Sequence, residues 1–292
     1  MQVALFGRKL PVQARENIAA LIDKLSQLQI RICMYEPLYR YLHSTFGLRP
    51  GVTGFFHDHS DLDPGTDYLF SLGGDGTFLE TLNLVRDSGI PVLGVNSGRL
   101  GFLSCISQEN MAESLDSFFS GRFDIEERML LKVEVSGREE DPCDVALNEV
   151  RIHKSSGSLI TVHVRANEEF LSAYWADGLL LSTPTGSTAY NLSVGGPIVV
   201  PESGSLVLSP IAPHNLTVRP LVLPDSAVLQ YAVDTRDEVF QLAMDSRTID
   251  IDRDATITVR RANYGLRMVR IENISFYSTL RNKLMWGADT RN

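Results

Sequence analysis

The hydrophobic residues in the first third of the chain form short apolar runs separated by helical patterns. The runs "VALF", "RICMY", "DYLFSL" and "PVLGVN" have the length and composition of buried strands. Between the first two, apolar residues recur at three- and four-residue spacing from Ile18 to Leu28, which predicts a helix within 11–30. Similar spacing predicts helices in "PLYRYLHSTF" and over 77–87. Strands that alternate with helices predict an α/β domain with a parallel, doubly wound sheet.

Beyond about Phe123 the hydrophobic period changes from helical to alternating. Leu131, Val133 and Val135 alternate with polar residues, and the apolar residues in 160–165 and 256–260 do the same. A period of two that is broken by turn residues predicts a second, all-β domain.

The last stretch, "FYSTLRNKLMWG", is helical again, with Leu280, Leu284 and Met285 on one face. A helix that follows an all-β domain has to bury such a face, and we expect this one to return to the first domain. The predicted boundaries are therefore 1–122 with 276–292 for the α/β domain, and 123–275 for the all-β domain.

Length and composition fit two domains. The 292 residues are 43% hydrophobic and 22% charged, which is ordinary for globular proteins. The net charge of −9 disfavours nucleic acid and anionic membranes as partners, so an anionic ligand has to be bound by local groups. The start "MQVALFGRKL" lacks signal-peptide features, and no apolar run approaches the roughly 18 residues of a membrane helix. Three widely spaced cysteines favour a reducing compartment, and we expect a cytoplasmic protein.

The segment "LGGDGT" joins an apolar strand to a predicted helix. Gly73 and Gly74 allow positive φ angles and a close approach of a ligand to the backbone, and a helix start offers unpaired N–H groups to phosphates. The segment matches neither a Walker loop nor G-x-G-x-x-G. Asp75 has two interpretations: it caps the helix, which is worth about 1 kcal/mol, or it takes a proton from an attacking hydroxyl. Phosphates repel a carboxylate, which favours the second interpretation.

The stretch "DGLLLSTPTGSTAYNLSVGGPIV", 177–199, has five hydroxyl residues among the seven positions 182–188. A loop that offers hydroxyls to a polar ligand and an elaborate structural turn both explain this density. Arg151, His153 and Lys154 form a basic group that either helps to hold phosphates or is a solvated strand face. The segment "HDHSDLD" from His57 is more typical of a solvated loop than of a metal site, and we predict no metal ligands there.

The combination of these motifs resembles the NAD kinase family. "GGDGT" is shared by NAD kinases, ATP-dependent phosphofructokinases and diacylglycerol kinase-like lipid kinases, which all transfer a phosphoryl group to an alcohol. "STPTGSTAY" is similar to a second NAD kinase signature, and "GVNSGRLGFL", "ALNEV", "PHNLTVRPLVLP" and the terminal "LRNKLMWG" match in order. The resemblance covers about 67–287.

This resemblance implies a Rossmann-like first domain, a β-sandwich-like second domain, and a homodimer or homotetramer. It implies transfer of the γ-phosphoryl group of ATP to the 2′-hydroxyl of the adenosine ribose of NAD⁺, giving NADP⁺ and ADP. Two other functions are a GGDGT-type lipid or sugar kinase and a non-catalytic dinucleotide sensor. "STPTGSTAY" argues against the first of these, and Asp75 argues against the second. The best phosphoryl donor, whether ATP, another triphosphate or polyphosphate, stays open.

The resemblance also implies roles for individual residues. Asp75 is implied as the general base, and Gly73, Gly74, Gly76 and Thr77 as phosphate-binding residues. Asn148 and Glu149 are implied to hydrogen-bond the adenosine portion of NAD⁺, and we expect Glu149 to be ionised. The other residues implied in NAD⁺ binding are Asp75, Gly76, Phe102, Asp177, Thr188, Ala189, Tyr190, Asn191, Leu192, Ser193, Ala212 and Asp245. A divalent cation, Mg²⁺, is expected to arrive with ATP, because the sequence shows no dedicated metal cage.

The chain departs from the family pattern at two places. It has Asp245-Ser246-Arg247 where the family usually has Asp-Gly-Gln, so no role is inherited at 247. Leu103 stands where an aromatic residue is common.

Overall fold

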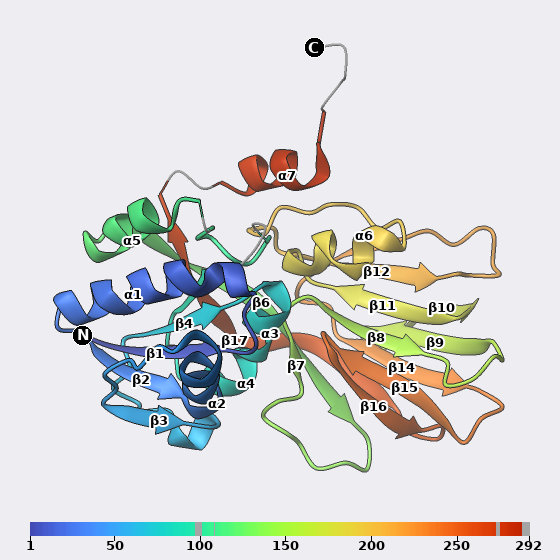
Figure 1. Cartoon of the computed structure of the whole chain (residues 1–292). Coiled ribbons are helices and arrows are strands. Elements are labelled where there is room, and N and C mark those ends of the chain that lie inside the picture. The colour runs from blue at the N-terminus through green and yellow to red at the C-terminus, as the bar shows by residue number, and fades with distance from the viewer. Residues whose placement is uncertain (97–100, 108, 273–274, 288–292) are drawn as a thin grey trace. The chain divides into compact units, whose positions relative to one another are not determined.

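The computed structural model describes the whole chain except residues 97–100, 108, 273–274 and 288–292 (Figure 1). The chain forms two compact units. The first consists of 1–127 and 266–292, and the second of 128–265. Strand β17 (Ile257–Ile271) carries the chain from the second unit back into the first.

The first unit contains a parallel sheet, as the sequence predicts. Its strand order is β5-β4-β1-β2-β3, and the last part of β17 pairs with β5 through Met268 and Val92. The strands are β1 (Gln2–Gly7), β2 (Arg31–Tyr35), β3 (Gly54–Phe56), β4 (Tyr68–Leu72) and β5 (Val92–Val95). All of these ladders are parallel. The chain order reverses between β1 and β4, and ligands of such sheets bind where the strand order reverses, at the carboxyl ends of the strands.

The helices of the first unit are mostly short. They are α1 (Arg15–Gln27), α2 (Glu36–Tyr41) with a π-helical turn (Leu42–Phe46), α3 (Asp75–Glu80), α4 (Leu82–Val85) and α5 (Met111–Phe119). Two 3₁₀ turns cover Val12–Ala14 and His59–Asp61. The single helix predicted over 77–87 is in fact two helices, and the first begins at Asp75. Helix α5 lies beside α1, where Lys24 and Asp116 pair at 2.6 Å (Figure 1).

Helix α7 (Phe276–Leu284) begins at a capping box in which Ser275 and Ser278 exchange side-chain and backbone hydrogen bonds. Leu280 is buried, as predicted. The prediction for Met285 is wrong, because the helix ends before it, its φ is positive and its side chain is 69% exposed. At the other end of α7, the ring of Phe276 lies 6.4 Å from that of Phe102, between centroids.

The second unit is an antiparallel β-sandwich, which confirms the predicted all-β class. One sheet has the order β10-β9-β14-β17, and β6 pairs with both β17 and β7. Its strands are β6 (Phe123–Val135), β7 (Val145–Ala146), β9 (Ile160–Ala166), β10 (Glu169–Ala176), β14 (Leu229–Asp234) and the first part of β17. The other sheet has the order β13-β12-β11-β8-β15-β16. Its strands are β8 (Glu149–His153), β11 (Gly178–Ser182), β12 (Ser205–Ile211), β13 (Leu221–Pro224), β15 (Val239–Met244) and β16 (Arg247–Asp252).

The alternating apolar residues of the two sheets share one hydrophobic core, in which Val150, Val162, Leu181, Leu208 and Phe240 are almost completely buried. The opposite face of the second sheet carries a 3₁₀ turn (Thr185–Thr188) and helix α6 (Tyr190–Ser193) close to β8 and β11. Within the described residues of both units, no helix is long and apolar enough to cross a membrane.

Candidate active site

The glycine-rich turn leaves its backbone open to a ligand. Gly73 has a φ of 154°, and a Cβ there would lie 2.5 Å from Thr77 Oγ1, so the turn requires glycine. Gly74 and Gly76 are exposed, and beyond their chain neighbours no atom of the described residues lies within 4 Å of where their Cβ atoms would be. The turn therefore combines one glycine that sets its shape with two that expose the chain.

Asp75 is held by the backbone of a distant segment. Its Oδ2 accepts a hydrogen bond from Phe102 N–H at 2.9 Å, and its Oδ1 accepts one from Leu103 N–H at 3.2 Å. A Cβ at Gly101 would lie 2.6 Å from Asp75 Oδ2 and closer still to Oδ1, so only glycine fits against the carboxylate. Gly74 is the N-cap of α3, and α3 has no side-chain cap. The capping interpretation of Asp75 is therefore wrong, because its carboxylate binds the backbone of Phe102 and Leu103 instead.

Asn148 and Glu149 are positioned by Asp245, which follows β15. Its Oδ2 accepts the N–H of Leu147 at 2.8 Å, and its Oδ1 accepts those of Asn148 and Glu149 at 2.7 and 3.1 Å. Asp245 has a positive φ of 51°, and its own N–H donates to Glu149 O at 3.0 Å. Burial raises the pKa of Asp245, while the three N–H groups act in the opposite direction. Asp245 thus fixes the main chain of the Asn-Glu pair.

Glu149 is less fully ionised at neutral pH than an ordinary glutamate. Burial, and then the negative charge of Asp245, raise the pKa of Glu149 to about 7. The Arg151 guanidinium and the Tyr190 N–H oppose this shift. Its Oε2 atom is buried and has no hydrogen-bond partner within the described structure. The charge of Glu149 therefore changes close to neutral pH, and one oxygen is available to a polar ligand.

The hydroxyl-rich stretch serves two purposes. Thr183 Oγ1 donates to Leu147 O at 2.5 Å, and Ser187 Oγ donates to Val199 O at 3.0 Å, so these buried hydroxyls hold the turn. A Cβ at Gly186 would collide with the backbone of Asn148. After these residues, Thr188, Ala189 and Tyr190 are only half-buried. Much of the hydroxyl density is thus structural, and the end of the turn faces outward.

The remaining residues implied in NAD⁺ binding have different surroundings. Asn191 is completely buried, where its Nδ2 donates to Pro197 O and its Oδ1 accepts from Ser209 Oγ at 2.7 Å. Leu192 is half-buried and Ser193 is exposed. Asn191 therefore shapes the turn from inside.

Asp177 and Ala212 adjoin each other at the edge of β11 and β12. Asp177 Oδ1 pairs with Lys154 Nζ at 2.5 Å, and its N–H donates to Ile211 O at 3.0 Å. Ala212 is exposed and has a positive φ of 46°. Lys154 of the basic group thus pairs with a residue of the same implied site.

Arg247, which departs from the family pattern, forms hydrogen bonds with residues of its own unit. Its Nη2 donates to Asp144 Oδ1 at 3.1 Å and to the carbonyl of Cys143. Because Asp144 is buried, this pair anchors the segment before β7. Sequence reasoning could not assign this role, which depends on two segments far apart in the chain.

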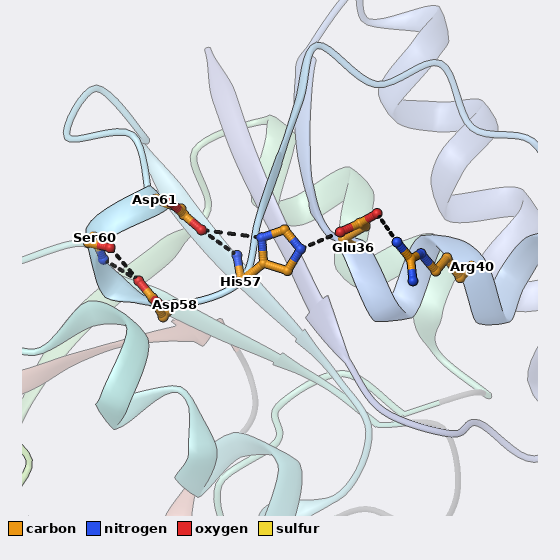
Figure 2. A network of polar contacts seen from close by, with 6 residues as sticks. All are labelled: Glu36, Arg40, His57, Asp58, Ser60 and Asp61. Carbon is orange, nitrogen blue, oxygen red and sulfur yellow. Dashed lines mark hydrogen bonds and ion pairs between the residues drawn. The ribbon is translucent and has the colours of Figure 1, made fainter.

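The histidine-rich segment is a network of local contacts (Figure 2). The hydrogen bond to Glu36 is the main cause that raises the pKa of His57, and the bond to Asp61 is the next largest. The bond to His57 lowers the pKa of Glu36. Asp58 accepts from Ser60 N–H and Oγ at 2.8 and 2.6 Å. In the described portion of the chain, no group of three His, Cys, Asp or Glu residues has metal-binding geometry.

The candidate residues thus form two groups, one on each unit. The glycine-rich turn, Asp75 and Phe102 belong to the first unit, and the other residues implied in NAD⁺ binding belong to the second. The predicted motif "GVNSGRLGFL" lies partly outside the described residues, at 97–100.

Comparison with known proteins identifies the family. Residues 3–123 match the ATP-NAD kinase N-terminal domain, and residues 147–271 match the ATP-NAD kinase C-terminal domain. An NAD kinase of Flavobacterium psychrophilum is 40% identical over 100% of both chains, and one of Porphyromonas gingivalis is 41% identical over 99% of both. The crystal structure of yeast NADH kinase complexed with NADH superposes with a TM-score of 0.85 at 26% identity, covering 99% of this chain and 89% of that one.

The fold is also that of an NAD kinase from Archaeoglobus fulgidus, solved in complex with ATP. The TM-score is 0.73 at 22% identity, over 98% of this chain and 99% of that one. Both family domains match in order, and the relatives align along the full chain. This chain therefore belongs to the ATP-NAD kinase family, and it is a phosphotransferase that acts on NAD.

Proposed function

We propose that this enzyme transfers the γ-phosphoryl group of ATP to the 2′-hydroxyl of the adenosine ribose of NAD⁺, with Asp75 as the general base. The observation that carries this proposal is the Asp75 carboxylate, which two backbone N–H groups hold beside an open glycine backbone. Each carboxylate oxygen has lone pairs beyond the one that accepts an N–H. Asp75 can therefore accept a proton without losing these hydrogen bonds.

In the proposed step, the ribose O–H bond breaks and its proton passes to Asp75. The ribose oxygen bonds to the γ-phosphorus, and the bond from that phosphorus to the bridging oxygen of ADP breaks. Phosphoryl transfer requires mainly positioning and electrostatic stabilisation. The proposed division of labour gives donor phosphates to the turn from Gly73 to Thr77, and the adenosine of NAD⁺ to Asn148 and Glu149. The NADH and ATP in the two solved relatives support substrates of these classes.

A kinase of this family uses a divalent cation that accompanies the nucleotide, and we propose that it is Mg²⁺. The residues fit a cation carried on the donor phosphates, because the turn offers only the Asp75 carboxylate and the described residues contain no carboxylate-histidine cage. Mg²⁺ neutralises phosphate charge when it is bound. The backbone of Gly74 and Gly76 then needs only to orient the phosphates, while Asp75 accepts the proton.

We also propose that the enzyme is a cytoplasmic homodimer or homotetramer that works without nucleic acid or membranes. Its net charge of −9 supports the absence of polyanionic partners. Cys33 and Cys105 are free and buried, which suits a reducing compartment. Light scattering at several concentrations measures the subunit number, and a monomer at all of them would contradict this part of the proposal.

The function is tested by incubating the pure protein with NAD⁺, ATP and Mg²⁺ and measuring NADP⁺, with Asp75→Ala as the matched control. We expect NADP⁺ from the wild type and almost none from the variant. A lipid or sugar kinase would leave NAD⁺ unchanged. A dinucleotide sensor would bind NAD⁺ in calorimetry without forming NADP⁺.

A further inference from the structure

Arg151 lies on the same face of β8 as Glu149, because side chains two residues apart in a strand point to one side. Its guanidinium carbon lies 5.2 Å from the centroid of the Tyr190 ring, which begins α6. Its partners on the neighbouring strands are Leu180 and Ala243, which are both apolar and buried. The guanidinium is therefore placed on an aromatic ring and not against a carboxylate of the adjacent strands.

The surroundings of Arg151 leave polar atoms unsatisfied. Its Nε and the Oε2 of Glu149 are both buried, and neither has a hydrogen-bond partner among the described residues. Arg151 forms no ion pair within 4.0 Å in that part of the chain, although its neighbour Lys154 pairs with Asp177. Buried polar atoms in folded proteins are nearly always bonded. The unpaired acceptor on this strand face, Glu149 Oε2, is what the hydroxyl of a bound polar ligand would satisfy.

We propose that Arg151 is a positioning residue for the acceptor nucleotide: it holds the Tyr190 ring in place and keeps Glu149 as a carboxylate that accepts the ribose hydroxyl hydrogen bonds. This inference rests on the proposed placement of the adenosine portion at Asn148 and Glu149. It replaces the two earlier interpretations of Arg151, a phosphate ligand and a solvated strand face, with a role that acts through two neighbours.

The charges around Glu149 determine the sign of the effect. Asp245, after β15, opposes ionisation of Glu149, while Arg151 on β8 and the Tyr190 N–H of α6 favour it. On β11 the partner of Glu149 is Ser182, which is uncharged. His153 lies two residues beyond Arg151 on the same face of β8. Loss of the Arg151 charge therefore raises the pKa of Glu149 further and leaves less carboxylate at neutral pH.

The test is the dissociation constant for NAD⁺, measured by calorimetry between about pH 6 and about pH 9. Wild-type affinity should fall as the pH drops through about 7, the pKa of Glu149. Arg151→Gln should move this transition upward by about one unit, the lower end for an adjacent opposite charge. Binding would then be about fivefold weaker at pH 7 and near wild type at the highest pH. Arg151→Lys keeps the charge and should keep the transition near its original position.

Two controls make each outcome decisive. Arg165→Gln removes an exposed arginine from β9 of the same unit and should leave both affinity and transition unchanged. Glu149→Gln should abolish the transition. A wild-type transition that survives in Glu149→Gln would overturn the proposed placement of the nucleotide and this inference with it. A transition that depends on Glu149 but does not move in Arg151→Gln would overturn only the role of Arg151.

Discussion

The packing of Gly101 against Asp75 predicts that Gly101→Ala inactivates the enzyme without touching a substrate. The new Cβ would lie 2.6 Å from Asp75 Oδ2 and closer still to Oδ1, whereas ordinary contacts of a Cβ begin at 3.4 Å. The carboxylate or the segment that donates to it therefore has to move by more than about 1 Å. A displacement of this size at a reacting group costs on the order of 100-fold in rate. We expect kcat to fall by roughly this factor, as measured by NADP⁺ formation at saturating substrates.

A double-mutant cycle shows whether the effect passes through Asp75. In an Asp75→Ala background the carboxylate is gone, so Gly101→Ala should cost almost nothing more. The matched control is Gly51→Ala in the same unit, where no described atom beyond the chain neighbours lies within 4 Å of the added Cβ, and kcat should not change. Wild-type kcat in Gly101→Ala, or a full additional loss in the Asp75→Ala background, would refute this reasoning.

Three further changes test the charged groups. Glu149→Gln should lower kcat/KM for NAD⁺ about 10- to 100-fold at pH 8 with little change in the KM for ATP. Because the pKa of Glu149 rises from 4.5 to about 7 on folding, the same change should stabilise the protein by up to about 3 kcal/mol above pH 7 and much less near pH 5. Equal melting temperatures of variant and wild type at alkaline pH would contradict this. Asp245→Asn leaves one of three backbone N–H groups poorly satisfied, which should lower the free energy of unfolding in denaturant by about 1–3 kcal/mol and weaken NAD⁺ binding. Wild-type binding in a destabilised variant would limit Asp245 to a structural role. His57→Gln removes a group whose pKa is raised by Glu36 and Asp61. The melting temperature should therefore fall at pH values below the unfolded pKa of His, and the effect should shrink as the pH rises through the higher folded pKa. A larger loss at alkaline pH would contradict the pairing.

The sheet of the first unit could be predicted from the sequence because its parallel strands are buried on both faces. Such strands are continuous apolar runs: β2, β4 and β5 lie within predicted runs, and β1 extends one residue beyond its run at each end. Helix α5 was missed, although Met111, Leu115 and Phe118 recur at helical spacing. The helix predicted from Thr77 starts two residues earlier, because the glycine-rich turn enters the helix directly at Asp75.

The sequence predicted which residues belong to the candidate site, but it did not predict their contacts. The motifs indicated Asp75 and Glu149, but the first is held by backbone N–H groups of a segment 27 residues away, and the second is tuned by burial. Neither relation leaves a local pattern in the sequence. The hydroxyls of the second motif show the same limit, since the sequence could not separate the buried Thr183 and Ser187 from the half-buried Thr188.

Asp75→Asn is the most direct test of the proton-accepting role. Asparagine keeps the size of the side chain and one oxygen that can accept the Phe102 or Leu103 N–H, but it cannot act as the base. A general base contributes about 10²- to 10⁴-fold to the rate. The melting temperature of the variant reports whether the loss of one N–H partner disturbs the fold.

The decisive measurement is the single-turnover rate of NADP⁺ formation by Asp75→Asn, taken with the dissociation constant for NAD⁺ of the same sample. The proton-acceptor role predicts a rate lower by about 10²- to 10⁴-fold with NAD⁺ affinity close to wild type. A near-normal rate would remove Asp75 from the chemistry, and an unchanged rate with weakened NAD⁺ binding would make it a binding residue alone.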